Sequence, residues 1–294
     1  MASEAPAESR SAGASAAEMH QSFLFYRRFF FLKVAAGLVI LSSLVYMVDS
    51  PRGGPSGGTW LGYTLGTIAA GIIVWLTWFG WRKRSYAATR ARLGAWLSAH
   101  VYLGLSLIVL ATLHCAFEFG YNIHTLAYVL MMLVIASGVY GIFAYARYPR
   151  LMTANRRGTT QIQVLGQIAS LDGEIRLALL GMEDAIVRVV APAIEHDDVG
   201  GSVWRQLSGR YPDCSTAGAL QGFTALEHTM PVARREEMRN IPALLTRKGE
   251  LLQRLRRDVQ YKAMMDIWLY IHVPLTFALL AALTAHIISV FFYW

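Results

Sequence analysis

Five apolar blocks, separated by polar segments, dominate this sequence. They cover about residues 29–48, 60–81, 95–117, 125–146 and 271–294. A helix needs about 20 consecutive apolar residues to cross the hydrocarbon core of a bilayer. The chain is also 55% hydrophobic, which is too apolar for an ordinary soluble domain. The sequence therefore predicts an all-α polytopic membrane bundle of five transmembrane helices, because helices satisfy their backbone hydrogen bonds internally.

Two of these blocks carry histidine pairs with the same spacing. His100 and His114 lie in the third block, and His272 and His286 lie in the fifth. At about 100° and 1.5 Å per residue, fourteen residues come within about 40° of whole turns and rise about 21 Å. Each helix is therefore expected to present two imidazoles on one face, near opposite sides of the bilayer.

Facing imidazoles inside a membrane suggest a bound cofactor. Uncompensated polar groups are costly there, and heme iron takes two axial nitrogen ligands. The spacing predicts two stacked hemes with His100, His114, His272 and His286 as iron ligands. Alternatively, each histidine hydrogen-bonds a carbonyl or hydroxyl group of a neighbouring helix. A zinc site fits less well, because histidines about 21 Å apart on one helix cannot share one ion.

Small residues occupy the stretches between the paired histidines. Gly104 lies between His100 and His114, and Ala278, Ala281, Ala282 and Ala285 lie between His272 and His286. Small side chains would let a flat macrocycle approach the helix, but they suit ordinary helix packing equally well. Gly104 is therefore a candidate cofactor-binding residue, with both interpretations open.

The run from His272 to His286, HVPLTFALLAALTAH, resembles the second heme-binding helix of the cytochrome b of respiratory quinol oxidoreductases. That helix also has thirteen residues between its histidines and a proline soon after the first. The stretch from His100 to His114 is similar to the first heme helix of that family. A second resemblance is to the transmembrane domain of ferric reductases and NADPH oxidases. Both resemblances imply electron transfer between two bis-histidyl b hemes.

Other redox centres are expected on partner subunits. The two cysteines, Cys115 and Cys214, cannot form a four-cysteine iron–sulfur cluster or a CxxCH attachment site for c-type heme. The sequence also shows no quinol-site motif of the first family and no flavin or nicotinamide domain. We therefore expect the membrane subunit of a larger oxidoreductase complex, whose partners carry flavin, iron–sulfur or c-heme centres.

The basic residues predict the orientation of the chain. They cluster beside apolar blocks rather than on one soluble face, so they indicate membrane lipid and not nucleic acid as the partner. Positive charges precede the third block at Arg82, Lys83, Arg84, Arg90 and Arg92, and follow the fourth at Arg147, Arg150, Arg156 and Arg157. The positive-inside rule then predicts a multi-pass protein of the cytoplasmic (inner) membrane, with the N-terminus inside and the C-terminus outside. The third and fifth helices are parallel in this topology, which pairs His100 with His272 and His114 with His286.

The expected organisation has four parts. We expect residues 1–22 to form a disordered cytoplasmic tail and residues 23–146 to form the first four spans. Residues 147–265 are expected to form a cytoplasmic helical domain, and residues 266–294 the fifth span. In the cytoplasmic domain, three- and four-residue steps predict an amphipathic helix through Leu165, Ile168, Leu171, Ile175, Leu179 and Met182. A further helix is expected to begin near Pro242 and to run directly into the fifth span.

Two other polar groups have competing interpretations. The stretch 195–198 (EHDD) contains metal-ligand types, but adjacent residues cannot all face one ion, which favours an acidic loop surface. His124, at the outer end of the fourth span, suits a quinone hydrogen bond, a proton relay or a simple interfacial position. The leading hypothesis is transmembrane electron transfer through two heme b groups. Its alternatives are a quinol-oxidising diheme enzyme and a heme-free five-span signalling or assembly protein.

Overall fold

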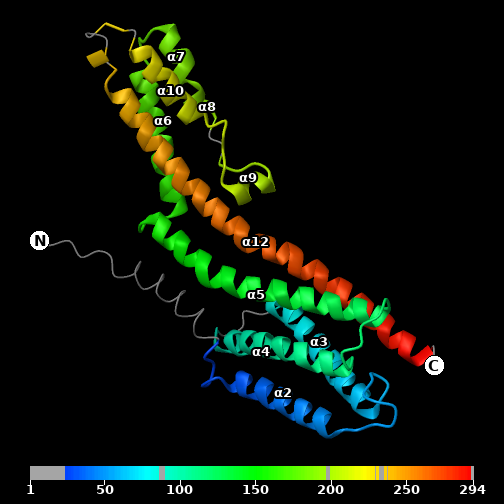
Figure 1. Ribbon diagram of the computed structural model, residues 1–294. Helices are drawn as coiled ribbons and strands as arrows, with labels where there is room; N and C mark the ends of the chain where they lie inside the picture. The colour runs from blue at the N-terminus through cyan, green and yellow to red at the C-terminus, as the bar shows by residue number, and fades with distance from the viewer. Residues whose placement is uncertain are drawn as a thin grey trace, which may run out of the picture. The chain divides into compact units, whose positions relative to one another are not determined.

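The computed structural model describes most of the chain as helix (Figure 1). Described are residues 24–85, 90–196, 199–228, 230–231, 235–236 and 238–292, without the side chains of 79–85 and 90–93. The structure is 79% helical, and its described part contains no strand. The expected tail at 1–22, part of the basic loop before the third span and part of the acidic stretch 195–198 lie outside the described residues.

Within the described residues, five helices are long and apolar enough to cross a membrane. They are α2 (Phe30–Val48), α3 (Trp60–Ser85), α4 (Arg90–His114), α5 (Ile123–Arg156) and the C-terminal α12 (Asn240–Phe292). The predicted fold class, an all-α bundle with a helical insertion between the fourth and fifth spans, is confirmed. The continuous course of α12 also agrees with the helix expected to begin near Pro242 and to include the last span.

Two predicted helix ends differ from the structure. The third apolar block was expected to stay helical to residue 117, but α4 ends at His114, because Ala116 and Phe117 adopt left-handed backbone angles. The fourth helix instead continues beyond residue 146, through Pro149 to Arg156. The apolar pattern ends before this helix does, so the sequence pattern located the apolar segment rather than the helix end.

The chain divides into two compact units. One unit includes the described chain up to Ala146 together with the stretch from Ile267, and the other is Arg147–Asp266. In the first unit, α2 and α3 both pack against α4. Its core joins residues from four helices: Leu61, Leu65, Ala69, Ile73, Leu76, Leu107, Leu110, Leu113, Met131 and Leu279.

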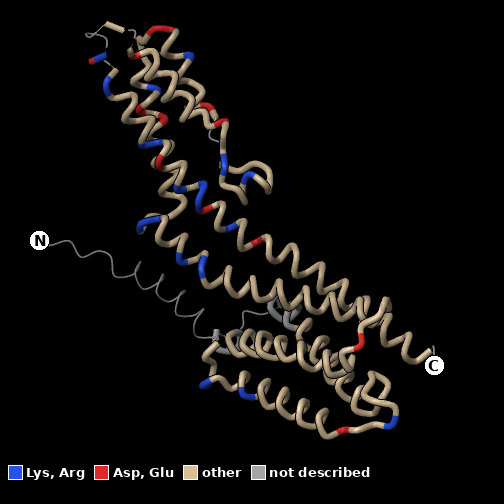
Figure 2. The backbone as a smooth tube through the Cα atoms, in the orientation of Figure 1, with Lys and Arg blue, Asp and Glu red and all other residues tan. Residues whose placement is uncertain are grey.

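The outer surface of this unit is apolar. On α2, the side chains of Ile40, Leu41 and Leu44 are exposed, and α12 exposes Phe277 and Ile288. Figure 2 shows few Lys, Arg, Asp or Glu along these helices and many more in the Arg147–Asp266 unit. An exposed, nearly uncharged apolar surface is what a bundle surrounded by lipid presents.

The Arg147–Asp266 unit is a small helical domain. Its further helices are α6 (Gln161–Ala178), α7 (Asp184–Val190), α8 (Pro192–Glu195), α9 (Val203–Ser208) and α10 (Ser215–Glu227). The amphipathic helix predicted in this region corresponds to α6, which buries Val164, Ile168, Leu171 and Ile175. Leu165 was assigned to the same apolar face, but its side chain is exposed. Val164 takes its place because it lies four residues before Ile168, on the buried face.

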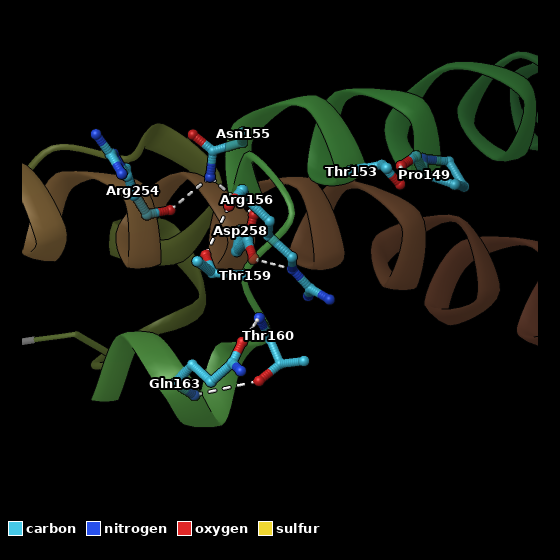
Figure 3. A network of polar contacts seen from close by, with 9 residues as sticks. All are labelled: Pro149, Thr153, Asn155, Arg156, Thr159, Thr160, Gln163, Arg254 and Asp258. Carbon is cyan, nitrogen blue, oxygen red and sulfur yellow. Dashed lines mark hydrogen bonds and ion pairs between the residues drawn. The ribbon is translucent and has the colours of Figure 1, made fainter. Parts of the chain in front are cut away.

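The junction between α5 and α6 is fixed by side chains (Figure 3). The side-chain amide of Asn155 donates to the carbonyl oxygen of Arg254 at 2.7 Å and to the carboxylate of Asp258 at 2.8 Å. Arg156 forms an ion pair with the same carboxylate. Thr160 then begins α6 with a capping box, in which its side chain accepts from the backbone of Gln163 and the side chain of Gln163 reaches back. These contacts attach the end of α5 to α12 within the Arg147–Asp266 unit.

Candidate functional site: two pairs of membrane histidines

The structure brings the four predicted histidines together as two pairs. The ring centroids of His114 and His286 lie 6.0 Å apart, with the ring planes at 71°. His100 and His272 lie close enough to interact electrostatically. The two pairs thus align α4 and α12 in parallel. All four residues belong to the apolar unit of the chain.

His114 is held by the neighbouring helix α3. Its Nδ1 lies 2.7 Å from the carbonyl oxygen of Gly62. Because a carbonyl can only accept, Nδ1 carries the proton and Nε2 keeps its lone pair. Gly66, one turn further along α3, leaves space for the ring, since a Cβ there would lie 2.6 Å from His114 Cε1. The backbone of α3 therefore fixes both the orientation and the tautomer of this imidazole.

His272 is held in a similar way by α5. The Oγ of Ser137 lies 2.8 Å from His272 Nδ1 and donates its own proton to the carbonyl oxygen of Val134 at 2.7 Å. A hydroxyl has one proton, so Ser137 must accept from His272 Nδ1. The Nε2 atom of His272 therefore also keeps a lone pair. Gly138 faces this ring, with its ideal Cβ position 3.5 Å from His272 Cε1.

The other two histidines have different surroundings. His100 lies beside the backbone of Leu76 in α3. Leu76 lies fourteen residues after Gly62, and His100 lies fourteen residues before His114. Because α3 and α4 are antiparallel, Gly62 lies beside His114 and Leu76 lies beside His100. The Nδ1 atom of His286 is buried and has no hydrogen-bond partner among the described residues.

Sequence reasoning placed His124 at an interface but did not connect it with the histidine pairs. Its ring lies edge to face against that of His286, with the centroids 4.3 Å apart. No group of three His, Cys, Asp or Glu residues in the described part of the chain is arranged as a metal site. His124 therefore packs against one member of a pair.

An aromatic contact supports the His100–His272 pair. The ring of Trp268 lies 5.3 Å from that of His272, one helical turn away on α12, and packs edge to face on Tyr145 of α5. Gly141 makes room for the indole, because any Cβ at this position would overlap it. Trp268 thus packs directly against the α5 backbone.

Gly104, the fifth candidate residue, faces α3. The nearest atom to its ideal Cβ position is Leu76 Cδ1 at 3.8 Å, an ordinary contact distance. This position agrees with small-residue packing between α3 and α4. It leaves open the prediction that Gly104 also contacts a cofactor.

The histidine pairs can be compared with what an iron porphyrin requires. A metal–imidazole bond is about 2 Å long and a ring nitrogen lies about 1 Å from its centroid, so two axial imidazoles have centroids roughly 6 Å apart. The separation of 6.0 Å between the His114 and His286 ring centroids agrees with this value. The protonated Nδ1 atoms of His114 and His272 are held by acceptors, which is the usual way in which a protein orients a metal-binding histidine. The separation of the His114–His286 pair and the held Nδ1 atoms of His114 and His272 therefore fit heme ligation.

The supporting residues had recognisable sequence signals. Gly62 and Gly66 form a GxxxG pattern in the second apolar block, and Ser137 and Gly141 show the same four-residue spacing of small residues in the fourth. Such patterns allow helices to approach closely in membranes. The patterns do not show which histidine each small residue contacts, because this depends on the packing of α3 against α4 and of α5 against α12.

Fold and site together define a polytopic helical membrane protein with two half-buried histidine pairs. Comparison with known proteins adds no relative, since no family model, no curated protein and no solved structure matches the sequence.

Proposed function

We propose that this protein is a diheme b-type cytochrome that carries electrons across the cytoplasmic membrane, as the membrane subunit of a larger oxidoreductase complex. His100 with His272 would hold one heme b, and His114 with His286 the other. The observation that carries the proposal is the 6.0 Å pairing of the His114 and His286 rings, because the hydrogen bonds of His114 and His272 also fit the alternative in which the histidines only bond neighbouring helices. One histidine of each pair has Nδ1 held by a fixed acceptor on a neighbouring helix, which leaves Nε2 for a metal.

The chain's own residues would set the properties of the bound groups. Heme supplies one-electron oxidation and reduction when bound. Ser137 and the Gly62 carbonyl orient two of the ligands and raise their basicity. The leucines at the core between the two levels, Leu107 and Leu279, exclude water. A lower local polarity disfavours extra charge and so tunes the potential at which an electron is accepted.

The orientation and the partners follow from charge and composition. The positive-inside rule assigns the Arg147–Asp266 unit to the cytoplasm and the His114–His286 pair to the outer side. The chain has only two cysteines, so electrons would reach or leave the hemes through flavin, iron–sulfur or c-heme centres on other subunits, or through quinone. The resemblance to respiratory cytochrome b and to the ferric reductase transmembrane domain supports the same role.

Pyridine hemochrome analysis of the purified chain tests the proposal. We expect b-type heme at about two per chain, low-spin spectra typical of bis-histidyl ligation, and no oxidation of NADPH by the chain alone. Heme well below stoichiometry after expression with heme supply would favour a heme-free five-span signalling or assembly protein. Robust NADPH turnover would exclude the subunit role.

A quinol-oxidising enzyme is the second candidate, and the position of His124 favours it. His124 lies against His286, so a quinone bound there would be close to one heme ligand. In this case quinol would reduce the hemes of the isolated chain, and His124→Ala would abolish the reaction while leaving heme content unchanged. If quinol does not reduce the hemes of the isolated chain, the chain would only transfer electrons between partner subunits.

A further inference from the structure

A small polar pocket lies within the Arg147–Asp266 unit. Its volume is about 290 Å³. The residues that line it are Gly209, Tyr211, Gln253, Arg256, Arg257 and Gln260. Two guanidinium groups and two carboxamides therefore supply hydrogen-bond donors, and none of the lining residues is acidic. A pocket of this size accepts a small molecule or a head group rather than a folded partner.

One wall of the pocket is fixed by side-chain contacts. The guanidinium of Arg256 lies over the ring of Tyr211, 4.4 Å from its centroid, and both of its terminal nitrogens donate to Cys214 Sγ at 3.3 Å. The Tyr211 hydroxyl in turn donates to the carbonyl oxygen of Val199 at 3.0 Å. Arg256 is thus positioned before any ligand arrives, which reduces the ordering that binding requires.

A second wall depends on a glycine. Gly209 ends α9 in the left-handed region, with φ 64°, and a Cβ there would lie 2.8 Å from the Gln260 side chain. The Gln260 amide donates to the carbonyl oxygen of Leu207 at 3.0 Å, which holds the carboxamide against the turn. Glycine therefore supplies both the backbone angle and the space that this side of the pocket requires.

Arg257 gives the pocket an uncompensated positive charge. It has no hydrogen-bond or ion-pair partner among the described residues, and two described acids, Asp213 and Asp258, pair with other arginines. Asp258 pairs with Arg156, and Asp213 pairs with Arg205 at 2.9 Å. The pocket thus combines an exposed free guanidinium with a second one already fixed in place, and no carboxylate lines it.

We propose that this pocket binds a phosphate group, carried by either a soluble phosphorylated molecule or an anionic lipid head group. Guanidinium groups bind phosphate oxygens in pairs of parallel hydrogen bonds, and the carboxamides of Gln253 and Gln260 add neutral donors. The four donor side chains, Gln253, Arg256, Arg257 and Gln260, lie on one face of α12, and the turn after α9 lines the rest of the pocket. The site is independent of the heme proposal, because it uses no residue of the histidine pairs.

The neighbouring turn provides a matched control. Ser208, Arg210 and Pro212 line a different pocket of about 510 Å³, whereas Gly209 and Tyr211 line the proposed phosphate site. Alternate residues of this turn therefore face different pockets. Arg210 is also exposed, so Arg210→Gln removes the same charge as Arg257→Gln from a nearby position outside the site.

Titration calorimetry with inorganic phosphate tests the soluble ligand. The full chain would be held in phosphatidylcholine nanodiscs at constant ionic strength. We expect saturable binding that Arg257→Gln weakens about tenfold or more, as the loss of a charge-assisted contact implies, and that Arg210→Gln changes by less than about twofold. Circular dichroism would verify that both variants fold.

A second arm tests the lipid source. Nanodiscs containing phosphatidic acid would be compared with phosphatidylcholine alone, and lipid retained by the chain would be counted by native mass spectrometry. Retention of phosphatidic acid that depends on Arg257, without phosphate binding, identifies a lipid head group as the ligand. The proposal is overturned if neither probe binds, or if Arg210→Gln and Arg257→Gln weaken binding equally, which would indicate diffuse charge attraction.

Discussion

The hydroxyl oxygen of Ser137 lies 2.8 Å from Nδ1 of His272 and accepts a hydrogen bond from the Nδ1–H group. This relationship fixes the tautomer of a histidine on the last helix from a residue on the fourth, 135 positions away. The Gly62 carbonyl fixes His114 in the same way from α3. Helices α3 and α5, which carry no predicted heme ligand, therefore orient His114 on α4 and His272 on α12.

Ser137→Ala removes the acceptor for His272. If His272 is an iron ligand, we expect heme affinity at that site to fall by about 10- to 100-fold, as for other residues that orient metal-binding histidines. Heme retention during dilution and the low-spin electron paramagnetic resonance signal measure this. The matched control is Ser106→Ala, whose hydroxyl donates only to the Leu103 carbonyl within α4. Equal effects of the two variants would show that Ser137 acts only in packing.

Gly66→Ala places a methyl group 2.6 Å from the His114 ring. The imidazole must shift, so its hydrogen bond to Gly62 weakens. We expect the heme held by His114 and His286 to be lost preferentially, which a redox titration of the remaining heme would detect. Gly71→Ala on the same helix meets nothing within 4 Å and should leave both hemes in place. Full heme content in Gly66→Ala would contradict the role of α3 as a ligand support.

Gly141→Ala introduces a Cβ that overlaps Trp268. The indole is rigid and packs between Tyr145 and His272, so relief requires a helix shift. Overpacking of this kind typically costs about 1–3 kcal/mol. We expect a melting temperature several degrees below that of the wild type, measured by differential scanning fluorimetry. Gly138→Ala, where the nearest atom is at 3.5 Å, should melt close to the wild type. The reverse order of stability would contradict the packing described here.

Lys248 anchors the core of the Arg147–Asp266 unit. Its ammonium group is fully buried and donates to the Asp172 carboxylate and to the Ala193 carbonyl. Lys248→Met leaves Asp172 largely buried without its cation, a change that typically costs about 3–5 kcal/mol. We expect faster hydrogen exchange throughout α6 and the first half of α12.

The combination of Lys248→Met with Asp172→Leu removes both charges and should recover most of the loss, because replacing a whole buried pair is often tolerated. Lys262→Met, which changes an exposed lysine on the same helix, is the control and should leave exchange unchanged. A double variant less stable than Lys248→Met would contradict this account, because it would show that Asp172 stabilises the unit even without its lysine.

Most of the fold could be predicted from the sequence, because lipid requires long apolar helices and their blocks are easy to recognise. The last helix was predicted as one continuous element, with Pro242 near its start. The end of α5 was missed because Asn155 and Arg156 continue the helix by contacts with Asp258, which no apolar pattern indicates. Leu165 was misplaced because Val164, its neighbour, fits the same periodicity.

The candidate site was predictable only in part. The fourteen-residue spacing located the four histidines on two helices, and the charge distribution paired them. The supporting contacts of Gly62 and Ser137, and the position of His124 against His286, depend on which helices are neighbours. Helix neighbours are set by packing of the whole bundle, and small-residue patterns indicate a close approach without naming the partner.

Heme content per chain, compared between the wild type and His286→Ala, tests the two-heme proposal most directly. We expect about two hemes per chain to fall to about one, with the heme between His100 and His272 retained. His228→Ala, at an exposed histidine, should keep both. Unchanged heme content in His286→Ala, or no stoichiometric heme in the wild type, would contradict the proposal that the two histidine pairs are heme ligands.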